Sequence, residues 1–260
     1  MSPDITSPTN ERIKWLVRLR ERRYRDDEGV FLVEGERLYR RALRAGLRPR
    51  VSFVSVDAGV DTVGETLTVA PTALDKASYR KRADDVIAVF PQLDTRLENV
   101  KLPGNPLVLI SEDVEKPGNL GAMLRTAAAA GADALIAVGG GPDPHNPNTV
   151  RASTGALFTT TLAISAWDEL EPWLKERDVE VLCSTPTTAE PVWDVDLTDA
   201  VAMVVGAEDA GVSERAAAVA DRAVHIPQAS GTVDSLNVSV AAGVLLFEAR
   251  RQRRSPAGPH

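Results

Sequence analysis

Short apolar runs recur through the second half of the chain, and stretches of helical length separate most of them. The runs lie at residues 107–110, 134–138, 161–164, 179–183, 202–205 and 223–226. Apolar runs that alternate with helices are typical of buried parallel strands, because helices cover both faces of such a sheet. The pattern therefore predicts a largely parallel α/β sheet in a domain that spans residues 106–254.

The first 95 residues carry shorter elements in a different order. Asn10 can cap a helix over residues 10–25, in which one face is apolar and the other is rich in arginine. Further strands are expected at residues 29–33, 51–56, 66–69 and 86–90, and further helices at residues 34–45 and 72–82. This order predicts a small α/β domain over residues 1–95.

A polar stretch separates the two patterns. Residues 94–105 read DTRLENVKLPGN and contain a Pro-Gly pair, which is typical of a connection rather than of a helix or a strand. We therefore expect a linker at residues 96–105. A flexible tail is expected at residues 255–260, which follow the last predicted helix.

The charge is distributed unevenly along the chain. Residues 1–50 hold 13 Arg and Lys against 8 Asp and Glu, although the whole chain has a net charge of −7. A basic segment on an acidic body indicates a local phosphate-binding face, for which Arg20, Arg22 and Arg23 of the first predicted helix are the candidates. The alternative is that these arginines form the solvated face of an amphipathic helix.

The composition excludes several classes of protein. No apolar run approaches the ~20 residues that span a bilayer, and the N-terminus lacks the apolar core of a signal peptide, so a cytoplasmic protein is expected. The single cysteine, Cys183, cannot form an intrachain disulfide, and its apolar setting favours an inert buried thiol. No metal is expected, because metal-ligand spacing is absent around the histidines at positions 145, 225 and 260.

Three glycine-bearing segments each lead into a helix of small residues. They read KPGNLGAMLRTAA at 116–128, VGAEDAGVSE at 205–214 and IPQASGTVDSLNVSVAA at 226–242. Such loops bring backbone amides and short polar side chains close to a ligand. A weaker segment of the same kind, VRASTGALF, lies at 150–158, whereas the glycines at 139–141 lack the Lys-Ser/Thr of a phosphate loop.

Taken in order, these segments resemble the signature motifs of the SpoU/TrmH family, RNA 2′-O-methyltransferases of the SPOUT class. The N-terminal pieces resemble the substrate-binding domain of the members that methylate 23S rRNA. The resemblance implies an α/β trefoil knot in the C-terminal domain and a ribosomal-protein-L30e-like fold in the N-terminal one. It also implies S-adenosylmethionine as cofactor, RNA as substrate and a homodimer, for which Val240, Val244 and Phe247 offer an apolar stripe.

The resemblance assigns roles to particular residues. Catalytic roles are implied for Asn119, Arg125, Glu208, Ser235 and Asn237. Cofactor contacts are implied for Gly206, Glu208, Gly211, Ile226, Gln228, Ser235 and Leu236. RNA contacts are implied for Arg125, Arg151 and Ser153. The family puts Arg125 forward as the group that activates the ribose hydroxyl, and the alternative is that Arg125 only orients the ribose while Glu208 or a water takes the proton.

The chain departs from the family pattern in the third segment. Gln228 stands where the family has methionine, and one extra residue lies between Pro227 and Gly231, so the loop around the adenosine is expected to differ in shape. Ribosomal RNA is the favoured substrate and transfer RNA the alternative. A non-catalytic RNA-binding or ribosome-assembly protein is the alternative from a different class, against which the complete set of implied catalytic residues argues.

Overall fold

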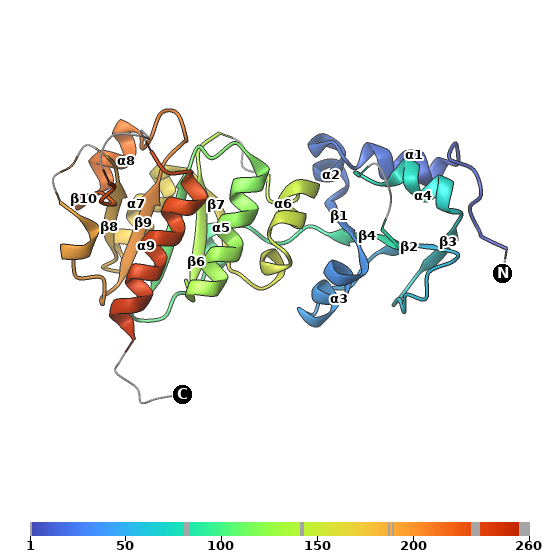
Figure 1. Cartoon of the computed structure of the whole chain (residues 1–260), viewed down its shortest axis with the longest axis horizontal. Helices are drawn as coiled ribbons and strands as arrows, with labels where there is room; N and C mark the ends of the chain where they lie inside the picture. Colours follow the sequence, from blue (N-terminus) through green and yellow to red (C-terminus); the bar gives the residue numbers. More distant parts are fainter. Residues whose placement is uncertain are drawn as a thin grey trace. The chain divides into compact units, whose positions relative to one another are not determined.

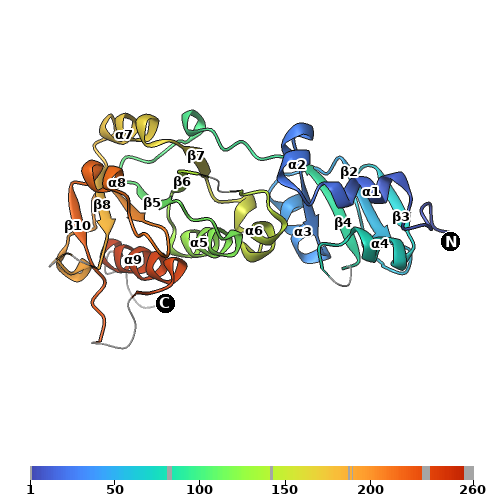
Figure 2. The same ribbon diagram turned by 90° about the horizontal axis from the view of Figure 1, so that it is seen from above.

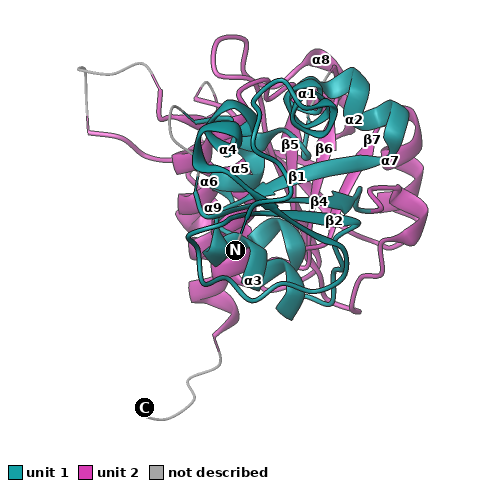
Figure 3. Cartoon of the chain, turned by 90° about the vertical axis from the view of Figure 1, so that its right-hand side faces the viewer, with its two compact units in different colours: residues 1–93, 143–159 teal, residues 94–142, 160–260 magenta. Residues whose placement is uncertain are grey.

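The computed structural model describes residues 2–80, 84–140, 143–186, 188, 190–229 and 235–254. The chain divides into two compact units, coloured separately in Figure 3. Unit 1 contains Met1–Leu93 and Asp143–Thr159, and unit 2 contains Asp94–Pro142 and Thr160–His260. The division differs in one place from the expected domains, because the segment Asp143–Thr159 groups with the N-terminal residues.

Unit 1 is built on a four-stranded mixed sheet in the order β1-β4-β2-β3. Its strands are β1 (Val30–Glu34), β2 (Val51–Ser55), β3 (Thr66–Val69) and β4 (Val86–Pro91). β4 is antiparallel to both of its neighbours, and β2 is parallel to β3. The four strands expected from the sequence in this region are therefore confirmed.

Helices cover both faces of this sheet (Figure 1). α1 (Glu11–Arg18) and α4 (Pro71–Ala77) pack with alternate strand residues such as Leu32, Phe53 and Ile87 into one core. α3 (Glu36–Arg44) lies against β1 and β4 on the other face, where Tyr39 meets Phe90. The alternation of strand side chains between two faces explains why both sides of a short sheet are apolar.

The expected single helix over residues 10–25 is wrong. Asn10 caps α1 as expected, but α1 ends at Arg18 and a second helix, α2 (Arg22–Glu28), follows an extended residue. The guanidinium of Arg25 is completely buried and donates to the carbonyl oxygens of Leu19 (3.0 Å) and Arg20 (2.7 Å). Arg25 thus satisfies the carbonyls that the break leaves without helical partners. The expected helix at 72–82 also ends early, at Ala77.

Unit 2 contains a six-stranded sheet in the order β10-β8-β9-β5-β6-β7, and every pairing is parallel. The strands are β5 (Leu107–Glu112), β6 (Ala134–Val138), β7 (Leu162–Ser165), β8 (Glu180–Ser184), β9 (Val201–Val205) and β10 (Arg222–Val224). This arrangement confirms the parallel α/β sheet that the apolar runs predict. No helix in the described part of the chain is long and apolar enough to cross a membrane.

The sheet of unit 2 lies between two layers of helices, as Figure 2 shows. The paired helices α5 (Pro117–Ala130) and α9 (Val238–Arg253) cover one face. α7 (Trp167–Lys175) and α8 (Glu214–Val219) cover the other, where Leu170 and Val219 belong to the main apolar core. The expected linker is partly built into this unit, because Leu97 joins the same core.

Short 3₁₀ turns complete the two units. η1 (Leu97–Asn99) and η3 (Val192–Asp194) belong to unit 2. The segment Asp143–Thr159 in unit 1 contains η2 (Ala156–Phe158) and the helix α6 (Pro147–Ala152), which packs on β1.

Buried polar and aromatic contacts attach this segment to the N-terminal residues. Asp143 forms an ion pair with the buried Arg25, and the ring of His145 stacks 5.1 Å from that of Phe31. His145 Nε2 accepts a hydrogen bond from the backbone N–H of Leu93 at 3.0 Å. Burial lowers the pKa of His145 to about 4, so the ring is neutral at physiological pH.

Candidate active site

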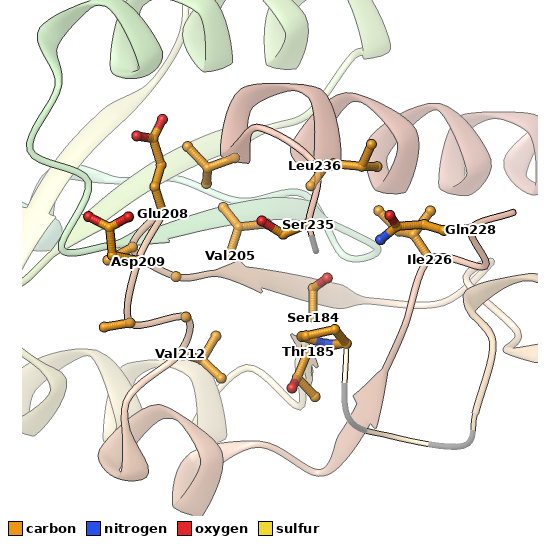
Figure 4. Close-up of a pocket in the computed structure, with 17 residues that line it drawn as sticks. Ser184, Thr185, Val205, Glu208, Asp209, Val212, Ile226, Gln228, Ser235 and Leu236 are labelled. Atoms are coloured by element: carbon orange, nitrogen blue, oxygen red, sulfur yellow. The ribbon is translucent and has the colours of Figure 1, made fainter. Parts of the chain in front are cut away.

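A pocket of about 590 Å³ opens at the carboxyl edge of the parallel sheet in unit 2. Open parallel sheets bind ligands at this edge, where the loops after several strands meet. The lining comes from the residues after β8, from the loop after β9, from the residues after β10 and from the start of α9 (Figure 4). Glu208 and Asp209 lie at one end of the pocket, and Ile226 and Gln228 at the other.

The loop after β9 folds into a closed turn that needs its glycines. Ala207 and Gly211 exchange two backbone hydrogen bonds of 3.0 and 2.9 Å. A Cβ atom on Gly206 would lie 2.1 Å from the carbonyl carbon of Gly211, which no side chain can tolerate. Gly211 itself has a φ of 69°, in the left-handed region. The predicted glycines therefore fix the shape of the loop that lines the pocket.

Glu112, the last residue of β5, anchors the C-terminal end of this loop through hydrogen bonds. Its carboxylate accepts hydrogen bonds from the N–H (2.8 Å) and the hydroxyl (2.6 Å) of Ser213, and from the indole N–H of Trp167 (2.6 Å). Ser213 in turn caps α8 by accepting from the N–H of Ala216 at 3.0 Å. Glu112 is only 2% exposed. Glu112 is not among the site residues expected from the sequence.

Three of the predicted catalytic side chains meet in one hydrogen-bonded cluster. Glu208 accepts from the side-chain amides of Asn119 and Asn237, the latter at 3.0 Å, and forms an ion pair with Lys116. The hydrogen bond from Lys116, with help from Asn119, holds the pKa of the Glu208 carboxyl below its usual value. Glu208 is therefore ionised at neutral pH and a weak proton acceptor.

Asn237 has two roles at once. Its side-chain oxygen accepts from the N–H (3.0 Å) and the hydroxyl (2.6 Å) of Ser239 and so caps α9, while its nitrogen donates to Glu208. Ser235 and Leu236 precede the cap and line the pocket, and their predicted contacts with a cofactor stay predictions. Gly231 of the same motif lies outside the described residues.

Arg125 does not line this pocket. It lies on the exposed surface of α5, six residues after Asn119, so at about 100° per residue it points roughly 120° away from that side chain. Among the residues that the structure describes, it has no hydrogen-bond or ion-pair partner. Its predicted contact with the RNA ribose therefore stays a prediction.

Two predicted RNA contacts, Ser153 and Arg151, lie in the segment Asp143–Thr159 of unit 1, and they differ in exposure. Ser153 is completely buried, donates its hydroxyl hydrogen to the carbonyl of Val150 at 2.7 Å and accepts from the N–H of Gly155. We correct its role accordingly: Ser153 shapes a turn and has no surface to offer RNA. Arg151 is exposed and donates to the side chain of Asn148 at 2.6 Å.

The three arginines that the sequence proposed for RNA contact are all engaged within unit 1. Arg20 is half-buried and donates to the backbone carbonyls of Lys76 and Ser78. Arg22 and Arg23 each form an ion pair one helical turn along α2, with Asp26 at 3.3 Å and Asp27 at 3.9 Å. Arg20 therefore has a structural role within unit 1, and its predicted contact with RNA stays a prediction.

The described residues offer neither a metal cluster nor a reactive thiol. In the described ranges, no group of three His, Cys, Asp or Glu side chains is arranged to hold a metal ion. Burial raises the pKa of the Cys183 thiol to about 12, so it is protonated at neutral pH and is not a nucleophile.

Known proteins share this architecture. Sequence profiles match the SpoU rRNA Methylase family over residues 106–247 and the MRM3-like substrate binding domain over residues 10–88. The chain is 31% identical to the 23S rRNA (uridine(2479)-2′-O)-methyltransferase of Streptomyces viridochromogenes, with 96% of this chain and 93% of that protein covered. It is 27% identical to the 23S rRNA (guanosine(2553)-2′-O)-methyltransferase RlmP of Bacillus subtilis, with 95% and 98% covered.

A solved structure extends the likeness to the whole fold. The AdoMet-bound rRNA methyltransferase of Sinorhizobium meliloti superimposes with a TM-score of 0.88 at 30% identity, covering 96% of this chain and 98% of that one. The residues that match the family profile include the loop after β9, the start of α9 and the cluster formed by Glu208, Asn119 and Asn237. The chain belongs to the SpoU rRNA methylase family.

Proposed function

We propose that the protein transfers a methyl group from S-adenosylmethionine to a ribose 2′-hydroxyl of large-subunit ribosomal RNA. The observation that carries this proposal is the pocket at the carboxyl edge of the sheet, bordered by the Glu208 cluster. Two relatives that match more than 90% of both chains are named as 23S rRNA 2′-O-methyltransferases, and the rRNA methyltransferase of Sinorhizobium meliloti is known with AdoMet bound. Because ribosomal RNA is the proposed substrate, the expected location is the cytoplasm.

The pocket fits this cofactor. Its volume of about 590 Å³ lies in the range of small-molecule sites, ~300–1,000 Å³. Val205, Val212 and Leu236 supply apolar walls for an adenine ring, and the closed turn of Gly206 and Gly211 brings backbone groups to the lining. When bound, S-adenosylmethionine supplies an electrophilic methyl group.

The chain's own residues orient the reactants. Glu208 fixes the side chains of Asn119 and Asn237, which come from α5 and α9. Fixed polar groups of this kind hold a nucleophile and an electrophile in line, which accounts for much of the acceleration in a transfer between two bound molecules. Since its lowered pKa makes Glu208 a weak base, we assign it to organisation of the site rather than to proton removal.

Arg125 is the proposed contact to the RNA. An exposed guanidinium without a partner among the described residues is available to a ribose or an adjacent phosphate, for which its planar fork is suited. Its binding would place the ribose and stabilise negative charge that develops on the 2′-oxygen.

A homodimer is the second part of the proposal. Val240 and Phe247 on α9 are 51% and 50% exposed, although the opposite side of α9 packs on α5 and the sheet. Apolar side chains at this spacing form a stripe that a second copy would cover. The exposure of both argues against the alternative that the stripe packs on the chain's own sheet.

The domain roles follow from the same family membership. We assign RNA binding to residues 1–95 and cofactor binding to residues 106–254, with the latter folded as a trefoil knot. The segment Asp143–Thr159 belongs to the second sequence region but packs in unit 1, so we group it with the RNA-binding residues.

Methyl transfer from radiolabelled S-adenosylmethionine to three unmodified transcripts, 23S rRNA, 16S rRNA and transfer RNA, tests the proposal. We expect label in 23S rRNA alone, at one ribose identified by mass spectrometry. Label in transfer RNA instead would show that transfer RNA is the substrate. If calorimetry shows no cofactor binding and no transcript is labelled, the protein is a non-catalytic RNA-binding member of the fold.

A further inference from the structure

The basic excess of the N-terminal region comes from one short stretch. Residues 1–35 hold seven Arg and Lys against seven Asp and Glu, whereas residues 36–50 hold six Arg against a single Glu. The stretch 36–50 begins with α3, which carries four of those arginines. The charge asymmetry therefore points to α3 and the residues after it, and not to α1 and α2.

The arginines of α3 form one outward face. Arg37, Arg41 and Arg44 follow one another at i, i+4 and i+7, so they lie along one side of the helix over about 10 Å. The buried positions Leu38, Tyr39 and Ala42 lie on the opposite side. We call Arg37, Arg41 and Arg44 the α3 arginine face.

This face is not neutralised within the chain. Glu36, the one acid of α3, pairs with Arg40, and Arg37 and Arg44 have no hydrogen-bond or ion-pair partner among the described residues. Like charges at i+3 and i+4 destabilise a helix. The repulsion between neighbouring arginines is an unfavourable contribution that a bound anion would relieve.

The face borders the one glycine-bearing segment that lies in unit 1. The guanidinium of Arg41 donates to the carbonyl oxygen of Thr154, and a Cβ on Gly155 would lie 2.7 Å from Cδ of Arg41. Gly155 therefore leaves room for the Arg41 side chain. The exposed Arg151 precedes the same turn and adds a further cation to this edge.

We propose that the α3 arginine face, together with Arg151, binds the phosphate backbone of the RNA substrate; this rests on the function proposed above. Guanidinium groups bind phosphate oxygens through paired hydrogen bonds. A protein partner fits less well, because protein interfaces are centred on apolar and aromatic side chains. None of the large exposed apolar side chains of the described residues lies on α3.

A charge-matched pair of double variants tests the proposal. Arg37→Gln/Arg44→Gln removes two cations from the α3 arginine face, and Arg22→Gln/Arg23→Gln removes two from α2. The probe is an unmodified 23S rRNA transcript, titrated by filter binding between about 50 and 200 mM KCl. Calorimetry with S-adenosylmethionine and a thermal melt accompany each titration.

For Arg37→Gln/Arg44→Gln we expect about tenfold weaker RNA binding and a salt slope reduced by about 1.4, since each single-strand phosphate contact contributes about 0.7. Its Tm should be equal to that of the parent or higher, because the repulsion on α3 is relieved. Arg22→Gln/Arg23→Gln should bind RNA within about threefold of the parent with nearly the same slope.

The outcomes separate this proposal from the one on which it rests. The assignment of RNA binding to the α3 arginine face is wrong if the α3 variant binds RNA with the parent's affinity and salt slope, or if the α2 variant binds more weakly. Either result leaves the proposed methylation of RNA intact. A parent that binds no transcript at the lowest salt also overturns this assignment. If the expected binding pattern appears but no transcript is methylated, the surface stands and the proposed activity fails.

Discussion

The side-chain nitrogen of Asn237 lies 3.0 Å from Oε1 of Glu208 and joins the start of α9 to the loop after β9. The two residues are 29 positions apart. Glu208 also accepts from Asn119 at the start of α5, so one carboxylate connects three segments that the sequence presents separately. One charged group therefore holds together the polar side chains that border the pocket.

Glu208→Gln should lower the rate of methyl transfer about a hundredfold while S-adenosylmethionine affinity changes only a few fold. Both asparagines donate to one oxygen of Glu208 and Lys116 to the other, so the amide nitrogen of glutamine faces either Lys116 or both asparagine donors, and Lys116 loses its counter-charge in either case. Single-turnover kinetics and calorimetry measure the two effects. Glu115→Gln, at an exposed carboxylate of the preceding turn, is the matched control and should resemble the parent.

The pH profile decides between organisation and base catalysis by Glu208. Because its pKa is held below the usual 4.5, its ionised form is present above that value and its contribution is lost only as pH falls through the lowered pKa. We expect the methylation rates of the parent and of Glu208→Gln to depend on pH in the same way near neutrality. A neutral limb that disappears in this variant would make Glu208 the proton acceptor.

Arg125→Ala should reduce methyl transfer about a hundredfold or more and leave cofactor affinity within a few fold, because Arg125 does not line the pocket. Arg125→Lys should fail as well, since a point charge does not reproduce the planar fork. Arg215→Ala, at an exposed arginine on α8, provides the control. Equal losses in cofactor affinity and turnover would contradict the assignment to RNA.

The apolar pattern and the glycine-bearing segments predicted the sheet of unit 2 and the residues that meet at its edge. Strand spacing is a local signal, and parallel strands place their carboxyl ends together regardless of sequence distance. The family resemblance put Asn119, Glu208 and Asn237 into one catalytic set, and the structure brings their side chains together. The role of Glu112 was not predicted, because a buried carboxylate that accepts only from neutral donors has no sequence signature.

Two errors in unit 1, the first helix and the domain boundary, involve one buried side chain. Arg25 looked like part of a solvated basic helix, yet it is buried and pairs with Asp143, which lies 118 residues further along. Arg25 binds the carbonyl oxygens at the break in the predicted first helix, and its pair with Asp143 attaches Asp143–Thr159 to the N-terminal residues. Helical periodicity and net charge cannot reveal a buried ion pair between distant segments, since each partner alone resembles a surface residue.

Glu112→Gln should destabilise the protein by about 2 kcal/mol, which corresponds to roughly 4–8 °C in Tm. The amide turns one acceptor into a donor that faces Ser213 or Trp167, so a buried group is left unpaired. Cofactor affinity should fall with it, because Ser213 ends the loop that lines the pocket. Glu214→Gln changes the exposed residue that follows Ser213 and should have the same Tm as the parent.

His145 should make the stability of the protein pH-dependent on the acid side. Its pKa is lowered from 6.5 to about 4 by burial, and the charge of Arg25 adds to this effect. The unfolded chain therefore binds a proton that the folded one excludes, so stability is full above pH 6.5 and falls by about 3 kcal/mol as pH drops to 4. His145→Gln keeps an acceptor for the N–H of Leu93 and should flatten this decline in denaturant titrations. An unchanged slope in the variant would show that other groups cause it.

Phe247→Glu should convert the protein to a monomer and reduce its activity. Phe247 is half exposed on α9, so the substitution costs little within the fold, whereas a carboxylate in an apolar interface between two copies would be left desolvated and unpaired. Because α9 begins at the Asn237 cap, loss of a partner on this helix is expected to loosen the pocket as well. Trp193→Glu changes another exposed apolar side chain of unit 2 and should leave the association state unchanged. Sedimentation velocity at micromolar concentration, combined with the methylation assay, measures both properties, and a fully active monomeric parent would end the proposal of a dimer.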